Sequence, residues 1–123
     1  MKYSIKFLIV ISILTQLSFT QNLDSKLISK KIELNFLKTK MRGIEYHKTI
    51  YFLEDDLQNI SAYENGKLKW RTNVISICKK PSVGKSEIRY MKLKDNKLIV
   101  IYGKHSFAEV NILNGKAEFI GSD

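Results

Sequence analysis

Hydrophobic and polar residues alternate with a period of two over most of the chain. The alternation begins at Ile32, Leu34 and Phe36, which are separated by polar residues, and this period is typical of strands with one buried face. Runs rich in β-branched and aromatic residues follow at residues 44–53, 57–64, 67–77, 87–94, 97–102, 106–113 and 116–120. The pattern predicts an all-β fold of about seven to eight antiparallel strands.

Short polar segments between these runs predict tight turns, and the strands are expected to form two meander units within one domain, residues 32–123. Asn65-Gly66 and Asn114-Gly115 each join two runs. Asn-Gly is a strong signal for a two-residue hairpin turn because both residues tolerate a positive φ. Asp95-Asn96 predicts another tight turn, and residues 79–86, which hold the single proline, predict the longest loop.

The two Asn-Gly turns coincide when the sequence is shifted by 49 residues without gaps. The same shift superimposes further apolar pairs: Ile50 on Ile99, Phe52 on Ile101, Tyr63 on Ile112 and Trp70 on Phe119. A period of about 40–50 residues with four strands per unit is typical of propeller blades. We therefore expect two related, blade-like units at residues 32–77 and 87–121. The alternative is a chance similarity between two hairpins.

The segment from Ile60 to Trp70, ISAYENGKLKW, resembles a repeat of the quinoprotein-like (PQQ-like) β-propeller family. Gly66, Lys67 and Trp70 match the family's Gly-Lys pair and its Trp, whereas Ala62 is displaced by two positions from the family's upstream Ala. The resemblance implies blades between which the Trp docks. It implies no cofactor site, because the family binds its cofactor inside a closed ring. Propellers close with about four to eight blades, and this chain has room for two.

The first twenty residues follow a different pattern, which is typical of a secretory signal peptide. Lys2 and Lys6 precede an apolar run at residues 7–17, and Ser18 and Thr20 suit cleavage before Gln21. The alternative is a membrane anchor, but a spanning helix needs about 20 apolar residues and this run is shorter. We expect residues 1–20 to be removed and the protein to be secreted or periplasmic.

The segment at residues 21–31 is ambiguous. Leu23, Leu27 and Ile28 have helical spacing, and Asn22 or Asp24 suits an N-cap. We expect an N-terminal arm or a short helix here, before the all-β domain begins.

The chain is basic, with 21 Lys and Arg against 12 Asp and Glu, and its 123 residues and 44% hydrophobic content fit one globular domain. One basic cluster covers residues 26–48. A second cluster, with tyrosine interleaved, is the predicted binding surface: Lys79, Lys80, Lys85, Arg89, Lys92 and Lys94. Because export argues against nucleic acid, the expected partner is another protein, an anionic glycan or a lipid headgroup. The alternative is a solvated, lysine-rich face that protects edge strands from pairing.

Catalytic and metal-binding patterns find little support. His47 and His105 are far apart in sequence and lack the spacing of zinc ligands. The single cysteine, Cys78, permits no internal disulfide and is expected to be buried at a strand end. Its lysine neighbours suggest the alternative of a reactive thiol with a lowered pKa, and a Cys-His dyad remains a remote third option.

Two short polar segments lack the patterns of known ligand-binding loops. Glu54-Asp55-Asp56 lacks the residue order of a calcium loop and is expected to be a polar turn. Gly84-Lys85-Ser86 lacks the upstream glycine of a phosphate-binding loop and leads into a strand.

The sequence therefore favours an exported, non-enzymatic binding module without a cofactor or metal. The alternative is a structural protein that oligomerises, as a homo-oligomer, through its edge strands. A small hydrolase that uses Cys78 or a histidine is the remote alternative. Trp70 is expected in the core, with a role in ligand contact as its alternative.

Overall fold

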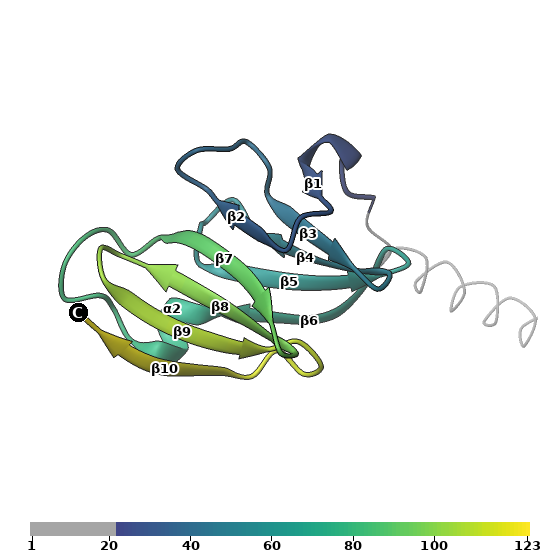
Figure 1. Ribbon diagram of the computed structural model, residues 1–123. Helices are drawn as coiled ribbons and strands as arrows, with labels where there is room; N and C mark the ends of the chain where they lie inside the picture. The colour runs from purple at the N-terminus through teal and green to yellow at the C-terminus, as the bar shows by residue number, and fades with distance from the viewer. Residues whose placement is uncertain (1–21) are drawn as a thin grey trace, which may run out of the picture.

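The computed structural model describes residues 22–123 and confirms an all-β architecture built from two five-stranded sheets. The sheets stack as two layers, with their loops gathered at opposite ends of the strands (Figure 1). The predicted signal peptide, residues 1–20, lies outside the described residues. Among residues 22–123, no helix is long and apolar enough to cross a membrane.

The first sheet contains an antiparallel meander of four strands. These are β3 (Gly43–Tyr46), β4 (Thr49–Leu53), β5 (Asn59–Glu64) and β6 (Lys67–Asn73). A two-residue strand, β1 (Ile28–Ser29), pairs parallel to β3 at the other edge. The long edge strand β6 is therefore the outer boundary of this sheet.

The second sheet repeats this plan. Its meander consists of β7 (Ile88–Lys94), β8 (Lys97–Tyr102), β9 (Ser106–Asn111) and β10 (Ala117–Ser122). The short strand β2 (Glu33–Asn35) pairs antiparallel to β7, so the N-terminal segment contributes one edge strand to each sheet. The strand expected around Ile32, Leu34 and Phe36 is β2, whereas the run expected at residues 44–53 is divided into β3 and β4 by the turn at His47-Lys48. This division and the unexpected β1 bring the total to ten among the described residues, compared with the seven to eight expected.

Three hairpins close through two-residue turns in which both central residues have positive φ. They are His47-Lys48, Asn65-Gly66 and Asp95-Asn96. The expectation that Asn114-Gly115 is a turn of the same kind is wrong, because only Gly115 has a positive φ and a longer loop joins β9 to β10. His47-Lys48 and Asp95-Asn96 hold the same place in their meanders but are 48 residues apart. The 49-residue shift that superimposes the two Asn-Gly segments therefore needs a one-residue gap to match the β3–β4 hairpin with the β7–β8 hairpin.

The core lies between the two sheets. Inward-facing residues alternate with outward-facing ones along β4 and β8, as the period of two predicts. The largest side chains that are almost completely buried come from both sheets and form one cluster: Tyr102, Ile44, Leu53, Ile60, Ile88, Met91, Leu98, Val74, Val100 and Val110. The two meanders therefore form one folded unit.

The strand expected at residues 67–77 ends early, which corrects one prediction. A short helix, α2 (Val74–Cys78), begins directly after β6, with the Asn73 side chain accepting a hydrogen bond from the Ser76 amide. Val74, Ile75 and Cys78 are its buried residues and pack into the core. Cys78 is buried as expected, but at the end of a helix instead of a strand.

The ambiguous segment before the domain contains a single turn of 3-10 helix, η1 (Ser25–Leu27). Its Asp24 side chain accepts a hydrogen bond from the Lys26 amide, so the expected cap is present. The chain then enters β1, crosses to the second sheet as β2 and returns to the first sheet as β3.

The two sheets have the same orientation. In Figure 1, β3 and β7 point to one side of the view, β4 and β8 point back, and both meanders descend in strand order. Because one sheet lies in front of the other, the front face of one meander meets the back face of the next. The outer face of the second sheet is thus the counterpart of the inner face of the first.

Candidate functional site

The fold divides the six basic residues of the predicted surface between two ends of the second sheet. Arg89 lies at the start of β7 and Lys85 in the loop before it, whereas Lys92 and Lys94 lie toward the end of β7, beside the β7–β8 turn. Lys79 and Lys80 follow α2 and enter the loop that leads to β7. The predicted cluster is therefore not one continuous patch.

A different set of residues meets at the end of the molecule where β7 begins, which we call the basic end. Asn35 of β2 pairs with Tyr90, and the Phe36 amide donates to the Arg89 carbonyl at 3.0 Å. This register places the β2–β3 loop beside the α2–β7 loop and the β8–β9 turn (Figure 1). Six exposed lysines lie in these loops: Lys38, Lys40, Lys79, Lys80, Lys85 and Lys104.

A groove at the basic end is lined by both apolar and basic side chains. Leu37 and Val83 line it together with Lys85, Arg89 and Lys104. Leu37 is 73% exposed and Val83 is 50% exposed, although leucine and valine are normally buried. Glu87 is the acidic residue in the same lining. The groove therefore combines apolar contact with an excess of positive charge.

Arg89 holds the floor of this groove in place. Its Nε donates to the Gly103 carbonyl at 3.0 Å, and its Nη2 donates to the Lys104 carbonyl at 2.7 Å. Gly103 has a φ of 59°, and a β-carbon at this position would lie 2.4 Å from the Pro81 side chain. Arg89, predicted to contact a ligand, thus acts on the backbone of the β8–β9 turn.

Lys79 also makes internal contacts. Its ammonium lies 4.6 Å from the centre of the Phe119 ring, and its carbonyl accepts a hydrogen bond of 3.0 Å from the Tyr102 hydroxyl. The helix α2 and the second sheet are joined by these contacts. Of the six predicted residues, Lys79, Lys80 and Lys85 are exposed in the α2–β7 loop, and Lys80 and Lys85 have no such contact with an aromatic ring among the described residues.

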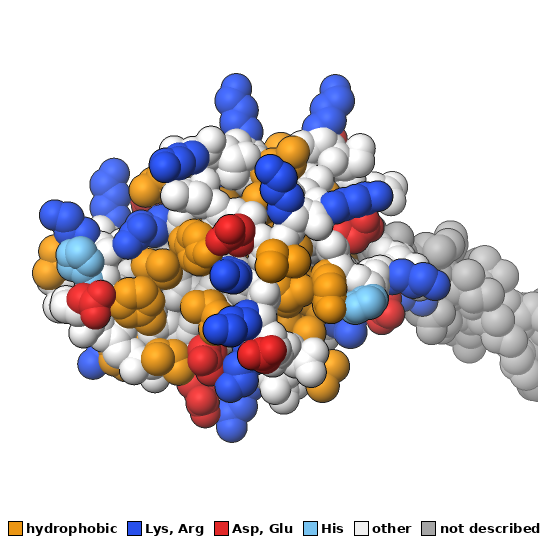
Figure 2. Space-filling model, viewed as in Figure 1, with side chains coloured by type: hydrophobic (Ala, Val, Ile, Leu, Met, Phe, Trp, Pro, Cys, Tyr) orange, Lys and Arg blue, Asp and Glu red, His pale blue; other side chains and the backbone are white. Residues whose placement is uncertain are grey.

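The outer face of the second sheet carries a row of partly exposed apolar side chains. Tyr90, Ile101 and Phe107 pair in register across β7, β8 and β9. The adjacent row crosses the sheet from Lys92 through Ile99 to Glu109. Figure 2 shows hydrophobic side chains on this face with acidic and basic side chains between them. All these side chains are partly exposed.

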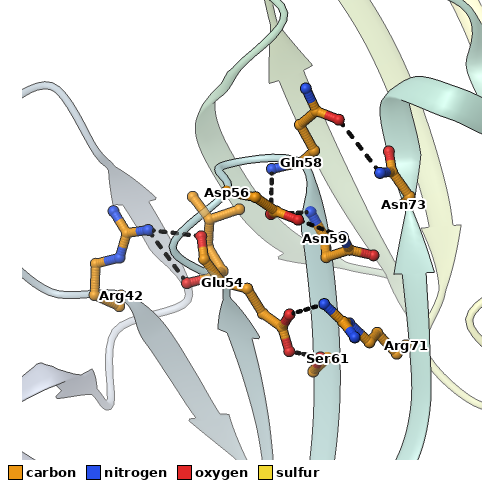
Figure 3. Close-up of polar contacts among 9 residues, drawn as sticks. Arg42, Glu54, Asp56, Gln58, Asn59, Ser61, Arg71 and Asn73 are labelled. Atoms are coloured by element: carbon orange, nitrogen blue, oxygen red, sulfur yellow. Dashed lines mark hydrogen bonds and ion pairs between the residues drawn. The ribbon is translucent and has the colours of Figure 1, made fainter.

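A network of polar side chains orders the β4–β5 turn at one end of the first sheet (Figure 3). The Glu54 carboxylate forms an ion pair with Arg71 at 2.6 Å and accepts a hydrogen bond from the Ser61 hydroxyl at 2.6 Å. The Asp56 carboxylate accepts from the amides of Gln58 and Asn59, both at 2.9 Å. The segment Glu54-Asp55-Asp56 is therefore a structured polar turn, as expected from the sequence.

These hydrogen bonds change the acidity of the turn. Partial burial acts to raise the pKa of Asp56, but the hydrogen bonds from Asn59 and Gln58 outweigh it, so the pKa is lowered from its ordinary value. Within residues 22–123, no group of three or more His, Cys, Asp or Glu side chains lies close enough to hold a metal ion.

The residues considered for nucleophilic catalysis are kept apart. His47 and His105 lie exposed in the β3–β4 and β8–β9 turns, at opposite ends of the strands. Cys78 is buried, and desolvation, followed by the charge of Glu118, raises the pKa of its thiol. The alternative of a lowered pKa is therefore wrong, because burial disfavours the charged thiolate.

Trp70 joins the two sheets. Its Nε1 donates to the Ile112 carbonyl at 2.9 Å, and the Thr72 hydroxyl donates to the Gly115 carbonyl at 2.5 Å. Gly115 lies against the indole, since a β-carbon there would be 2.6 Å from two ring atoms. Trp70 is only 8% exposed and belongs to the core cluster, as expected.

Sequence reasoning missed three residues of the groove. Lys104 stands alone between Gly103 and His105, while Leu37 and Val83 lie in segments expected to be loops or strand ends. The only available signal was an apolar residue flanked by lysine or glycine in a turn, which is too common to identify a site.

No protein-family model matches this chain, and the searches of curated proteins and of solved structures also give no match.

Proposed function

We propose that the protein is an exported, non-enzymatic binding module that recognises an anionic partner through its basic end. The observation that carries the proposal is the groove in which exposed Leu37 and Val83 stand among Lys85, Lys104 and Arg89. Export rests on the N-terminal pattern of residues 1–20. The burial of Cys78, with both histidines exposed in turns, supports a role without catalysis.

The distribution of acids supports the same choice of surface. Glu87 lines the groove, and Asp123 is tied to the β8–β9 turn because its amide donates to the His105 carbonyl at 3.0 Å. The acidic turn of the first sheet lies at this end too, where Glu54 is paired with Arg71 while Asp55 and Asp56 are exposed. The six exposed lysines outnumber the four side-chain carboxylates of Asp55, Asp56, Glu87 and Asp123, and an excess of charge of one sign attracts an anionic partner.

The proposal is tested by moving charge at one end of the molecule only. The variant Lys38→Glu, Lys85→Glu, Lys104→Glu changes the basic end, and its matched control changes the opposite end through Lys67→Glu, Lys94→Glu, Lys116→Glu. Both variants have the same net charge. Retention on a sulfated-polysaccharide column, measured over a salt gradient, should fall much further for the first variant. Equal loss in the two variants would refute a localised anion site.

Export is tested separately. Mass spectrometry of the chain recovered from the medium or periplasm of an expressing cell should show a mature N-terminus at Gln21. Retention of the whole N-terminal segment on the recovered protein would contradict the proposed signal peptide.

We also propose that the two meanders are successive blades of a propeller-like repeat. The common orientation of the sheets supports this, because adjacent blades also pack front to back. The contact of Trp70 with the β9–β10 turn of the other meander supports it as well. Phe119, which the sequence shift superimposes on Trp70, does not reach toward a neighbouring blade, since it pairs with inward-facing Ala108 and lies beneath Lys79.

A second candidate function is assembly of several copies of the chain. It is favoured by the row of Tyr90, Ile101 and Phe107 on the outer face of the second sheet, which is the counterpart of a face that is covered within the chain. In this form the contact uses sheet faces in place of the edge strands considered from the sequence. Light scattering on the purified, exported protein decides: several chains per particle would support assembly, and one chain would exclude it.

A further inference from the structure

We propose that the partner of the basic end is a phospholipid membrane surface with anionic headgroups, into which Leu37 and Val83 insert. This inference rests on the proposed function and names its partner. It is drawn from the combination of exposed apolar side chains with lysines in the same groove.

The apolar side chains are what favour a lipid surface. Leu37 and Val83 occupy loop positions in different segments, yet they line one groove at the end of the molecule. An anionic polysaccharide or a free phosphate offers these side chains no apolar environment, so their exposure would remain unfavourable in such a complex. The boundary between lipid headgroups and acyl chains accepts apolar groups and anion-binding groups together.

The lysines are placed to contact the headgroups around the inserted side chains. Lys38 adjoins Leu37 in the β2–β3 loop, and Lys85 follows Val83 closely in the α2–β7 loop. A lysine near an anionic membrane surface extends its ammonium toward the headgroups while its methylene chain lies along apolar surface. Lys40, Lys80 and Lys104 extend the same charge over the three loops.

Backbone hydrogen bonds hold the two apolar side chains in position before binding. The Leu37 amide donates to the Asn35 side-chain carbonyl at 3.1 Å, and the Lys38 amide donates to the Asn35 backbone carbonyl at 2.9 Å. The Lys104 amide donates to the Val83 carbonyl at 2.9 Å. A loop that is already ordered loses less conformational entropy on binding, so each contact with the membrane contributes more to affinity.

The experiment measures binding of the exported protein to vesicles by co-sedimentation. One set of vesicles is phosphatidylcholine alone, and the other contains phosphatidylglycerol as well. The apolar variant is Leu37→Gln, Val83→Gln, which leaves every charge unchanged. Its matched control, Ile77→Gln, Leu113→Gln, replaces two side chains that are 60% and 74% exposed elsewhere. Thermal unfolding confirms that each variant is folded.

We expect the wild-type protein and the matched control to bind the anionic vesicles and not the neutral ones. The apolar variant should lose about tenfold in vesicle affinity, since burial of its side chains contributes to binding, while its column retention on sulfated polysaccharide stays unchanged. Wild-type affinity of the apolar variant for vesicles would overturn the membrane inference alone. Binding to the polysaccharide without binding to vesicles would also overturn it, and would favour a glycan partner. If the charge variants of the basic end and of the opposite end lose column retention equally, the proposed function itself would be overturned.

Discussion

At the scale of single residues, the structure is stabilised where a side chain of one sheet meets the backbone of the other. Trp70 is the clearest case, because its indole fills the space that a side chain at position 115 would occupy. The indole nitrogen also satisfies a carbonyl of the β9–β10 loop, which is otherwise buried beneath it. Because the contact depends on both Trp70 and Gly115, a substitution at either position tests it.

The change Trp70→Phe should lower the free energy of unfolding by about 1–3 kcal/mol, because the Ile112 carbonyl loses its donor in a buried site. Gly115→Ala should destabilise the protein as well, since the new methyl group would lie 2.6 Å from the indole and the φ of 75° disfavours other residues. Urea unfolding measures both. An unchanged midpoint in either variant would show that the two sheets are not coupled through this contact.

Tyr90 should have an unusually high pKa. Desolvation, a hydrogen bond to the Glu33 carboxylate and the charge of that carboxylate raise it from 10.0 to about 12. A raised pKa of an acid means that the stability contributed by the neutral hydroxyl is present below about pH 10 and is lost as the pH rises through 12. An ultraviolet titration of the wild type should contain a late step that is smaller by one tyrosine in Tyr90→Phe, since the pKa values of Tyr51 and Tyr102 are also raised by burial. Identical late steps in the two proteins would contradict the assignment.

The thiol of Cys78 should be inert in the folded protein. It is 5% exposed, and burial raises its pKa, so little thiolate is present or accessible at neutral pH. We expect Ellman's reagent to react slowly with the native protein and rapidly once it is unfolded in urea. Rapid reaction under native conditions would show that α2 opens readily or that the thiol is exposed.

At the scale of elements, the alternation of side chains located nearly every strand, because a period of two is what one buried face requires. It failed at β6, where the run of Trp70, Thr72 and Val74 suggested that the strand continues. Val74, Ile75 and Cys78 are instead buried on one side of a helical turn, and tertiary packing overrides the strand preference of two β-branched residues. The alternation did locate β2, but it missed β1, because two residues carry almost no periodicity. It also read residues 44–53 as one run, since the turn at His47-Lys48 contains no glycine, proline or asparagine to mark it.

The change Asn73→Ala tests how α2 is specified. Its side chain accepts a hydrogen bond of 3.0 Å from the Ser76 amide, and loss of such a cap costs about 1 kcal/mol. Asn73→Ser keeps a capping oxygen and should retain most of the stability. Equal unfolding midpoints for the alanine variant and the wild type would mean that the helix depends on packing of Val74 and Ile75 alone.

At the scale of the whole molecule, the candidate site arises only when separate segments meet. Composition correctly indicated an excess of positive charge. Proximity in the sequence grouped Lys92 and Lys94 with Lys79 and Lys85, but the length of β7 separates the first pair from the second. The groove depends on the register between β2 and β7, which brings Leu37 close to Val83. Such a pairing between distant segments leaves no pattern in a single sequence.

The most direct test of the proposed binding site is amide hydrogen exchange of the exported protein with and without anionic vesicles. Binding through the basic end predicts slower exchange in the β2–β3 loop, the α2–β7 loop and the β8–β9 turn, residues 36–42, 79–87 and 103–105. Exchange at the opposite turns, including Asn65-Gly66 and Asp95-Asn96, should not change. Protection confined to those opposite turns or to the outer face of the second sheet, or no protection anywhere, would contradict the assignment of function to the basic end.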